Sequence, residues 1–384
     1  MSGPLTGIKV LELEAIGPAP FAGMLLADMG ADVLVIDRPA STDLGLKRER
    51  RHDVMMRGKR SVTLDLKSAS SKEVSFQLIE KADVLIEGLR PGVMERLGLG
   101  PDEALKRNPR LVYGRMTGWG QTGPLAARAG HDINYIALAG VLNAFGRKDE
   151  APVPPLNLVG DFGGGGMLLG FGVACALVEG RRSGKGQVID AAMVEGASLL
   201  AAMFSGFLAA NNWSEERGVN VLDTGAPWYN VYETKDGKYV SIGAIEERFF
   251  QELLLKLGLD GPNLPSQHER TRWPEMTALF QKIFKSKTRE QWCKVFEGSD
   301  ACFAPVLSFS ESRADPHSRA RQSFVSLAGV AQPAPAPRFS RTPGGVGRAP
   351  PERGEGGRAA LADWGFVENE IKQLESRGLG FIKT

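Results

Sequence analysis

Short apolar runs alternate with helix-like segments along the N-terminal part of the chain. Residues 8–13 and 31–37 are the apolar runs typical of buried strands in a parallel sheet. The segment between them begins at Gly17, carries prolines near its start and ends at Gly30, which predicts a helix. A strand, a helix and a second strand in this order predict a β-α-β unit with parallel strands.

The same alternation continues to about residue 222. Further strands and helices are expected over residues 61–66, 70–81, 82–87, 111–116, from Asp161 to about Gly180, 187–191 and 194–210. The pattern predicts an α/β fold, with a Rossmann-like parallel sheet in a large domain. The dinucleotide fingerprint GxGxxG is absent from the first turn, so we do not expect this sheet to bind NAD.

The pattern changes in the next part of the chain. Two strand-like segments, residues 229–234 and 239–243, flank a turn that contains Asp236 and Gly237, which predicts a β-hairpin. Helical periodicity then predicts helices over residues 246–257, 273–285 and 288–296. Strands followed by helices are typical of a small α+β domain.

These patterns divide the 384-residue chain into three parts. The large domain is expected over residues 1–222 and the smaller α+β domain over 223–330. A C-terminal segment, 331–384, is expected to return to the large domain. Its first part, 332–358, is rich in Pro, Gly and Arg and predicts an extended strap, followed by a last helix over 359–376.

Composition restricts the class of partner. A net charge of +2 predicts no general attraction to nucleic acid or to an anionic membrane. The apolar stretch of residues 162–178 is shorter than the roughly 20 residues of a membrane span, so a buried helix is expected. No signal peptide is evident at the N-terminus, which favours a cytoplasmic location. Three cysteines without paired spacing predict reduced thiols, neither disulfides nor a zinc site: Cys175, Cys293 and Cys302.

Two motifs contain side chains that commonly transfer protons near neutral pH. His131, one of four histidines, lies between Gly130 and Asp132. Asp161 and Phe162 precede four consecutive glycines and an apolar helix, whose N-terminus would favour a negative charge. The glycines leave room for a ligand, and N–H groups near them could stabilise an oxyanion. A histidine and a separate carboxylate can remove a proton from one face of a carbon and return it to the other.

Each of these residues also has a structural interpretation. Asp161 can be a helix N-cap, with the glycines serving tight helix packing. His131 can be a buried, hydrogen-bonded histidine, and Asp132 a loop cap. Glu246 can stabilise the first turn of a helix, or it can orient His131. Basic residues near strand ends can bind phosphates or carry solvated surface charge: Arg38, Lys59, Arg60, Lys67 and Arg90. The P-loop, HExxH and GxSxG motifs are absent.

Several stretches together carry a closer resemblance to a known family. They are Gly17 to Phe21, Gly58 to Ser61, Leu64 to Lys67, Arg90 to Met94, Gly130 to Tyr135 and Gly184 to Asp190. Over nearly its whole length, the chain resembles the α-methylacyl-CoA racemases of the family III CoA-transferase superfamily. The resemblance implies an interlocked homodimer, with each active site between the large domain of one subunit and the small domain of the other.

The resemblance also implies roles for individual residues. His131 and Asp161 match the two bases of the racemases, Glu246 matches a glutamate that supports the histidine, and Asp132 matches a site beside it. Contacts with CoA are implied at Arg38, Leu64, Lys67, Arg90, Met94 and Tyr135. The implied reaction interconverts (R)- and (S)-2-methylacyl-CoA thioesters through an enolate. The resemblance implies no metal or other cofactor, because CoA is part of the substrate, and no nucleic-acid or membrane partner.

Two other functions stay open from the sequence. CoA-transferases of the same superfamily keep the aspartate that matches Asp161 and use it as a nucleophile, forming an acyl anhydride. They generally lack a histidine at the position of His131. A non-catalytic acyl-CoA-binding protein is the third hypothesis. Because the chain carries both side chains, we expect a cofactor-independent isomerase.

Overall fold

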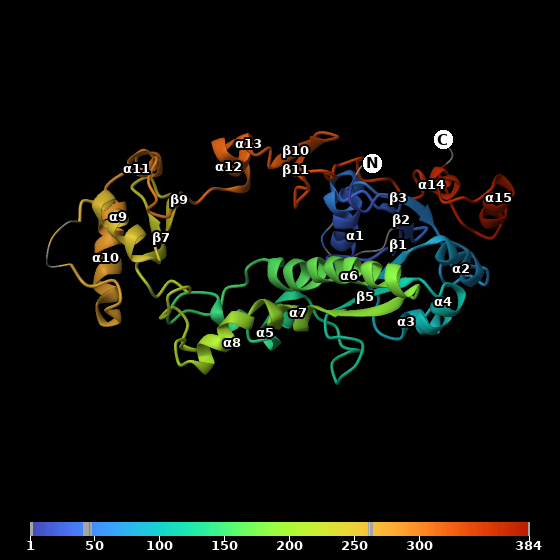
Figure 1. The fold of residues 1–384 in the computed structure, drawn as a ribbon, viewed down its shortest axis with the longest axis horizontal. Coiled ribbons are helices and arrows are strands. Elements are labelled where there is room, and N and C mark those ends of the chain that lie inside the picture. Colours follow the sequence, from blue (N-terminus) through green and yellow to red (C-terminus); the bar gives the residue numbers. More distant parts are fainter. Residues whose placement is uncertain (1–2, 41–45, 47, 260, 262–263, 383–384) are drawn as a thin grey trace. The chain divides into compact units, whose positions relative to one another are not determined.

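A computed structural model describes residues 3–40, 46, 48–259, 261 and 264–382 (Figure 1). The chain forms two compact units. The first consists of the residues up to Ala139, Pro155–Ala201 and the residues from Gln322 onward, and the second consists of Gly140–Pro154 and Ala202–Arg321.

The unit boundaries differ from the predicted ones at 222/223 and 330/331. The second unit already begins at Ala202 and also includes Gly140–Pro154. Arg217 attaches Gly140–Pro154 to the second unit, because its guanidinium donates hydrogen bonds to the carbonyls of Asn143, Arg147 and Glu150. These bonds join segments that are far apart in the sequence, so local patterns do not reveal them.

In the described part of the chain, the first unit contains one six-stranded sheet in the order β3-β2-β1-β4-β5-β6, with all pairs parallel. The strands are β1 Lys9–Leu13, β2 Asp32–Asp37, β3 Arg60–Thr63, β4 Val84–Glu87, β5 Val112–Thr117 and β6 Gln187–Ala192. This is the order of doubly wound nucleotide-binding sheets. The predicted α/β fold with a Rossmann-like parallel sheet is therefore confirmed.

Alternate residues of each strand face two separate hydrophobic clusters, as the period of two in a strand requires. Leu11 and Leu34 belong to one cluster, whereas Val10 and Val33 belong to the other. The first cluster is covered by α2 Ser71–Lys81, α4 Pro101–Arg107, α14 Gly357–Asp363 and α15 Glu368–Ser376. The second is covered by α1 Pro18–Asp28, α5 Asp132–Leu138, α6 Leu168–Ser183 and α7 Met193–Leu200. Helices thus cover both faces of the sheet (Figure 1).

The C-terminal segment packs against the edge strand β3. Thr63 and Gly380 exchange two backbone hydrogen bonds of 2.8 and 3.0 Å, and the N–H of Ser61 donates to the carbonyl of Glu355. A hairpin of β10 Phe324–Leu327 and β11 Val330–Pro333 precedes the strap. The single helix predicted over residues 359–376 is two helices, α14 and α15, because Gly365 between them has a φ of 89°.

The second unit contains an antiparallel sheet of β7 Tyr229–Glu233, β8 Tyr239–Gly243 and β9 Phe303–Pro305. The predicted turn joins β7 and β8, with Gly237 at a φ of 69°. Its helices are α8 Ala202–Ala209, α9 Glu247–Leu257, α10 Trp273–Phe284, α11 Arg289–Phe296, α12 Phe309–Ala314 and α13 Pro316–Ala320. Buried aromatic residues, among them Trp228 and Phe280, form its core. The helix predicted over 194–210 is two helices, α7 in the first unit and α8 in the second.

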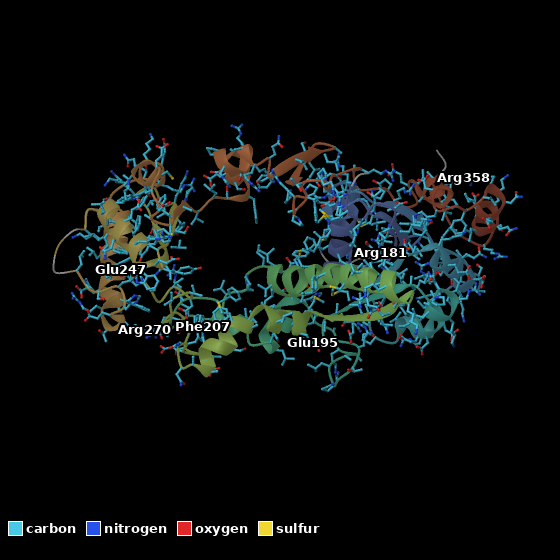
Figure 2. All side chains as sticks on the ribbon, viewed as in Figure 1. Arg181, Glu195, Phe207, Glu247, Arg270 and Arg358 are labelled. Atoms are coloured by element: carbon cyan, nitrogen blue, oxygen red, sulfur yellow. The ribbon has the colours of Figure 1, made fainter. Side chains whose placement is uncertain are left out.

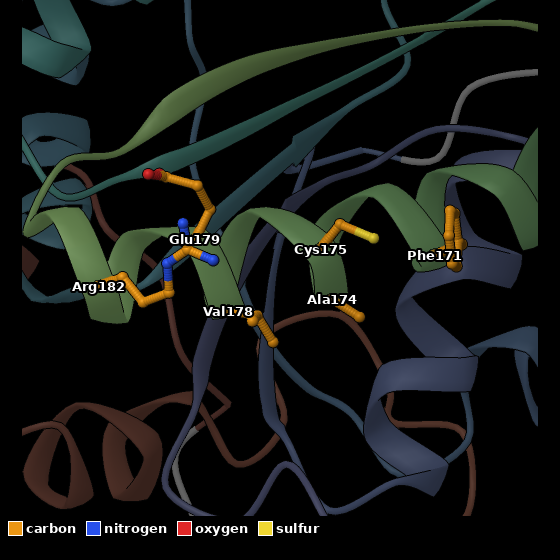
Figure 3. Close-up of a pocket in the computed structure, with 6 residues that line it drawn as sticks. All are labelled: Phe171, Ala174, Cys175, Val178, Glu179 and Arg182. Carbon is orange, nitrogen blue, oxygen red and sulfur yellow. The ribbon is translucent and has the colours of Figure 1, made fainter.

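One long helical segment runs through the first unit. The π-helix η4 Leu158–Met167 continues into α6, and an 18-residue window of these 26 residues has a mean hydropathy of 1.5. The helix is thus long and apolar enough to cross a membrane, and it exceeds the predicted stretch of residues 162–178. A core helix can pass the same test, and this one packs on β5 through Leu169 and on α1 through its glycines. Phe171 and Val178 on its other face are 67% and 62% exposed and line a shallow pocket (Figure 3).

Candidate active site

Asp161 lies in the first turn of the π-helix η4, whose N-cap is Asn157. The backbone N–H of Asp161 donates to Oδ1 of Asp132 at 2.7 Å. Nδ2 of Asn157 donates to Oδ2 of Asp161 at 2.9 Å. The interpretation of Asp161 as the N-cap is therefore wrong: it stands inside the helix, and a neighbouring side chain holds its carboxylate.

The glycines after Phe162 allow the helix to pack closely against its neighbours. A Cβ on Gly164 would lie 2.6 Å from the backbone nitrogen of Ala197, and one on Gly166 would lie 2.7 Å from the carbonyl oxygen of Pro18. These approaches support tight helix packing for both positions. In a π-helix that begins at Leu158, the i→i+5 pattern assigns the N–H of Gly163 to the Leu158 carbonyl. Of the N–H groups near the glycines, that of Gly163 is therefore engaged within the helix, and the predicted oxyanion contact stays a prediction.

The carboxylate of Asp161 faces the loop at the start of α1. Its Oδ2 lies 3.2 Å from the position that a Cβ on Gly17 would occupy, and Gly17 has a φ of 67°. Burial raises the pKa of Asp161, and the charge of Asp132 raises it further, whereas Asn157 and His131 lower it. A partly buried carboxyl with a raised pKa is suited to carrying a proton closer to neutral pH.

His131 and Asp132 are adjacent in sequence but lie in different environments. His131 is exposed and immediately precedes α5, where its backbone N–H donates to Oδ1 of Asn134 at 3.0 Å. The interpretation of His131 as a buried histidine is therefore wrong. Asp132 is 4% exposed, and its Oδ2 has no hydrogen-bond partner among the described residues. Through the bond from the Asp161 N–H, Asp132 joins the two segments that carry the candidate bases.

Tyr135 lies one helical turn after His131. Its hydroxyl donates to the carbonyl of Gly130, and its ring meets Trp119 edge to face, with centroids 4.7 Å apart. Burial raises the pKa of Tyr135 to about 12; the charge of Asp161 adds to this shift and the charge of Arg90 opposes it. Tyr135 therefore lies within electrostatic range of both a candidate base and a predicted CoA-binding residue.

The predicted CoA-binding residues gather at the carboxyl ends of the parallel strands. Arg38 follows β2, Lys67 follows β3, and Arg90 follows β4. The strand order reverses between β1 and β4, and doubly wound sheets bind ligands in the crevice at this switch point. Leu64 and Met94 are each only 1% exposed and belong to the hydrophobic core, so their predicted contacts with CoA stay a prediction.

Glu246 belongs to the second unit, where it is the exposed residue before α9. Its neighbour Glu247 is labelled in Figure 2. The predicted support of His131 by Glu246 stays a prediction.

Two contributors to the site were not predicted, namely Asn157 and Gly160. Asn157 precedes Asp161 by four residues, a spacing at which side chains of one helix meet. This spacing could have predicted a hydrogen bond from the Asn157 amide to the Asp161 carboxylate. Gly160 is required by a tertiary contact: a Cβ there would lie 2.6 Å from Oδ1 of Asp132. Sequence spacing gives no signal for such a contact.

The described residues contain no group of three or more His, Cys, Asp or Glu side chains that could hold a metal ion. Cys175, Cys293 and Cys302 are free cysteines.

The doubly wound sheet, with basic residues after its strands near the switch point, is typical of α/β proteins that bind a nucleotide-containing ligand. Residues 5–356 match CoA-transferase family III, and the chain belongs to this family. It is 45% identical to alpha-methylacyl-CoA racemase of Mus musculus over 374 residues, 97% of this chain and 96% of that protein. It is 44% identical to the Homo sapiens racemase, with the same coverage. A CAIB/BAIF family protein from Brucella suis has a similar structure, with a TM-score of 0.80 and 27% identity over 95% of this chain and all of that one.

Proposed function

We propose that this chain is an isomerase that interconverts (R)- and (S)-2-methylacyl-CoA thioesters. The observation that carries the proposal is the joining of His131 and Asp161 through Asp132, which holds two different proton carriers at one site. The identity of 45% to an alpha-methylacyl-CoA racemase over nearly the full length supports the same reaction.

The proposed chemistry is a proton transfer at one carbon. The thioester makes the α-hydrogen acidic; His131 removes it from one epimer, and the C–H electron pair moves into an enolate. Asp161 then gives its proton to the opposite face, which forms the new C–H bond and leaves the carboxylate ionised. The reverse reaction exchanges the two roles. The CoA of the substrate is the only cofactor that this reaction needs.

A CoA-transferase is the second candidate, because the chain belongs to a family named for that activity. In a transferase, Asp161 would attack the thioester carbonyl and release the CoA thiolate, which leaves an acyl anhydride. His131 favours the isomerase, because an anhydride mechanism does not need a second proton carrier opposite the aspartate.

Incubation of one epimer of a 2-methylacyl-CoA in heavy water tests the proposal. We expect both epimers to form and one deuterium to enter at C2. No deuterium at C2 with any branched acyl-CoA would overturn the isomerase. Transfer of CoA to a free carboxylic acid, with trapping of an acyl-Asp161 by hydroxylamine, would establish the transferase instead. If the acyl-CoA is unchanged in both assays, the result would favour the third hypothesis, a non-catalytic acyl-CoA-binding protein.

We also propose that the active form is a homodimer in which Glu246 supports the partner's active site. The long helical segment of the first unit carries apolar residues that its own unit leaves exposed: Leu158, Met167, Phe171 and Val178. Exposed apolar patches of this kind mark contact surfaces between proteins. A second copy of the chain is the occupant that the family resemblance implies.

A heterodimer of His131→Asn and Glu246→Gln subunits tests this arrangement. If each site combines residues of two subunits, one of the two sites receives both lesions and the other receives none. We expect each homodimeric variant to be impaired and the purified heterodimer to recover about half of the wild-type activity. A heterodimer no more active than its parents would contradict the shared site.

A further inference from the structure

Arg353, in the C-terminal strap, reaches the carboxyl ends of β1 and β2. Its Nη2 donates to Oε1 of Glu14 at 2.5 Å and its Nη1 donates to Oε2 at 2.9 Å, a two-bond contact with a single carboxylate. Nη1 also donates to the carbonyl oxygen of Arg38 at 2.9 Å. Glu14 follows β1, and its side chain is only 8% exposed.

The same carboxylate holds the loop after β2. Oε2 of Glu14 accepts the backbone N–H of Arg38 at 2.8 Å. The backbone of Arg38 is therefore fixed on both sides, by Glu14 at its N–H and by Arg353 at its carbonyl. Burial alone would raise the pKa of Glu14, but the hydrogen bonds from Arg353 and Arg38 keep it below its usual value, so the carboxylate stays ionised.

The segment around Arg353 is itself anchored to the sheet. The N–H of Gly354 donates to the hydroxyl of Ser61 at 2.8 Å, and Nε of Arg50 donates to the carbonyl of Pro351. Arg50 also pairs with the fully buried carboxylate of Asp37. Residues on both sides of Arg353 are thus held by β3 and by the loop before it. These contacts fix the position of the Arg353 guanidinium beside Glu14.

We propose that Arg353 is a positioning residue that sets the Arg38 loop for the phosphates of CoA. This inference rests on the proposed function, in which Arg38 binds the nucleotide end of the substrate. Arg353 neutralises Glu14, whose Oε2 lies only 4.0 Å from Nη1 of Arg38. Without Arg353, an unneutralised Glu14 draws the Arg38 guanidinium toward itself and away from an anionic ligand.

The other side of the switch point has the same kind of anchor. Oε2 of Glu87, at the end of β4, accepts the backbone N–H of Leu89 at 2.7 Å, next to Arg90. Nε of Arg115 donates to Oε1 of Glu87 at 2.8 Å. Both loops with a predicted CoA-binding arginine are therefore tied to a strand-end glutamate that an arginine neutralises. On the β2 side, the neutralising arginine comes from the strap.

The test compares two ligands and three variants. Calorimetry measures the dissociation constant of CoA and of pantetheine, which lacks the nucleotide, for wild type, Arg353→Ala, Arg353→Lys and Arg358→Ala. Arg358 of α14, labelled in Figure 2, is the control, because it pairs with the exposed Glu368 of α15. Steady-state epimerisation gives KM and kcat for the CoA and pantetheine thioesters of the same acid. Melting temperatures identify any variant that fails to fold, and Arg353→Lys keeps the charge if Arg353→Ala does not fold.

We expect Arg353→Ala to weaken CoA binding about tenfold, the usual size for a lost charged hydrogen bond, and to raise KM while kcat changes little. Arg353→Lys should lie between, because lysine cannot make the two-bond contact. Pantetheine binding and the Arg358→Ala control should not change. Equal weakening for both ligands, or unchanged CoA binding, would overturn the inference, as would a wild-type chain that does not bind CoA. If wild type binds CoA without epimerising its thioesters, the proposed function fails, and the calorimetric comparison still decides the role of Arg353.

Discussion

The two candidate bases are held in contrasting ways. Asp161 is partly buried inside a helix, its N–H is bound by Asp132, and its carboxylate is bound by Asn157. His131 is exposed before a short helix, and its backbone is held by α5, since its N–H donates to Oδ1 of Asn134 and its carbonyl accepts the N–H of Asn134. The surroundings of Asp161 within one unit therefore determine both its place and its pKa. For His131, the proposed function assigns the orientation of the ring to Glu246.

The buried position of Asp161 affects its pKa. Burial raises the pKa of Asp161, which brings a carboxylate closer to the range in which histidine titrates. The first unit thus holds both the backbone and the carboxylate of Asp161, and it holds the backbone of His131.

Replacing either base should produce the largest effect. We expect His131→Asn and Asp161→Asn each to slow epimerisation by about 10²- to 10⁴-fold, the usual contribution of general acid-base catalysis. CoA binding should be kept in both variants. Chiral chromatography of the product and calorimetry with CoA measure the two properties. A variant that keeps most of its epimerisation would remove that residue from the mechanism.

Gly160→Ala should break the connection between the bases without touching either side chain. The new Cβ would lie 2.6 Å from Oδ1 of Asp132, so Asp132 or the Asp161 backbone must move. A displacement of about 1 Å can cost about 10²-fold in rate. Gly170→Ala is the matched control, because its Cβ would meet only a side-chain atom of Leu25 at 3.9 Å. Equal activity of the two variants would show that the connection is not needed.

Asn157→Ala should change the pH dependence of one direction. The hydrogen bond from Asn157 lowers the pKa of Asp161, so its loss raises that pKa further. Asp161 must be ionised to remove a proton. The acid limb of kcat/KM should therefore move to higher pH for the epimer that Asp161 deprotonates. Initial rates from each pure epimer across a pH series measure the shift; no shift for either epimer would disconnect Asn157 from the titration of Asp161.

The smallest expected effect is on stability. Because burial raises the pKa of Asp161, the ionised carboxylate is less stable in the folded chain than in the unfolded one. The stability that this group gives is present below its unfolded pKa and is lost as pH rises through the folded pKa. Asp161→Asn should then raise the Tm near neutral pH and have less effect in acid. A Tm that falls at neutral pH would indicate that the charge stabilises the fold.

Much of the first unit could be predicted from the sequence, because its strands and helices have clear periods. The apolar runs around Val10 and Val33 are β1 and β2, and the helix between them begins at Pro18 and ends at Asp28. Helices of four to seven residues, such as α3 Val93–Arg96 and α4, are too short to show a period. Their position depends on tertiary contacts, including the Arg115 pair with Glu95 on α3.

The site itself was only partly predictable. The motifs at His131 and Asp161 predicted that one candidate base is a histidine and the other a carboxylate. The π-helix was not, because its close contacts come from Pro18 and Ala197, which are distant in sequence. The bond from Arg353 to Glu14 spans 339 residues, so no local pattern could indicate it.

Exchange measured separately from each pure epimer tests most directly the central claim that two different bases act on two faces. In heavy water, the wild type should exchange and invert either epimer of a 2-methylacyl-CoA. His131→Asn should still exchange the α-hydrogen of one epimer, without inversion, and Asp161→Asn should still exchange that of the other. Loss of exchange from the same epimer in both variants would contradict the two-base account. Inversion that stays close to the wild-type rate in either variant would also contradict it.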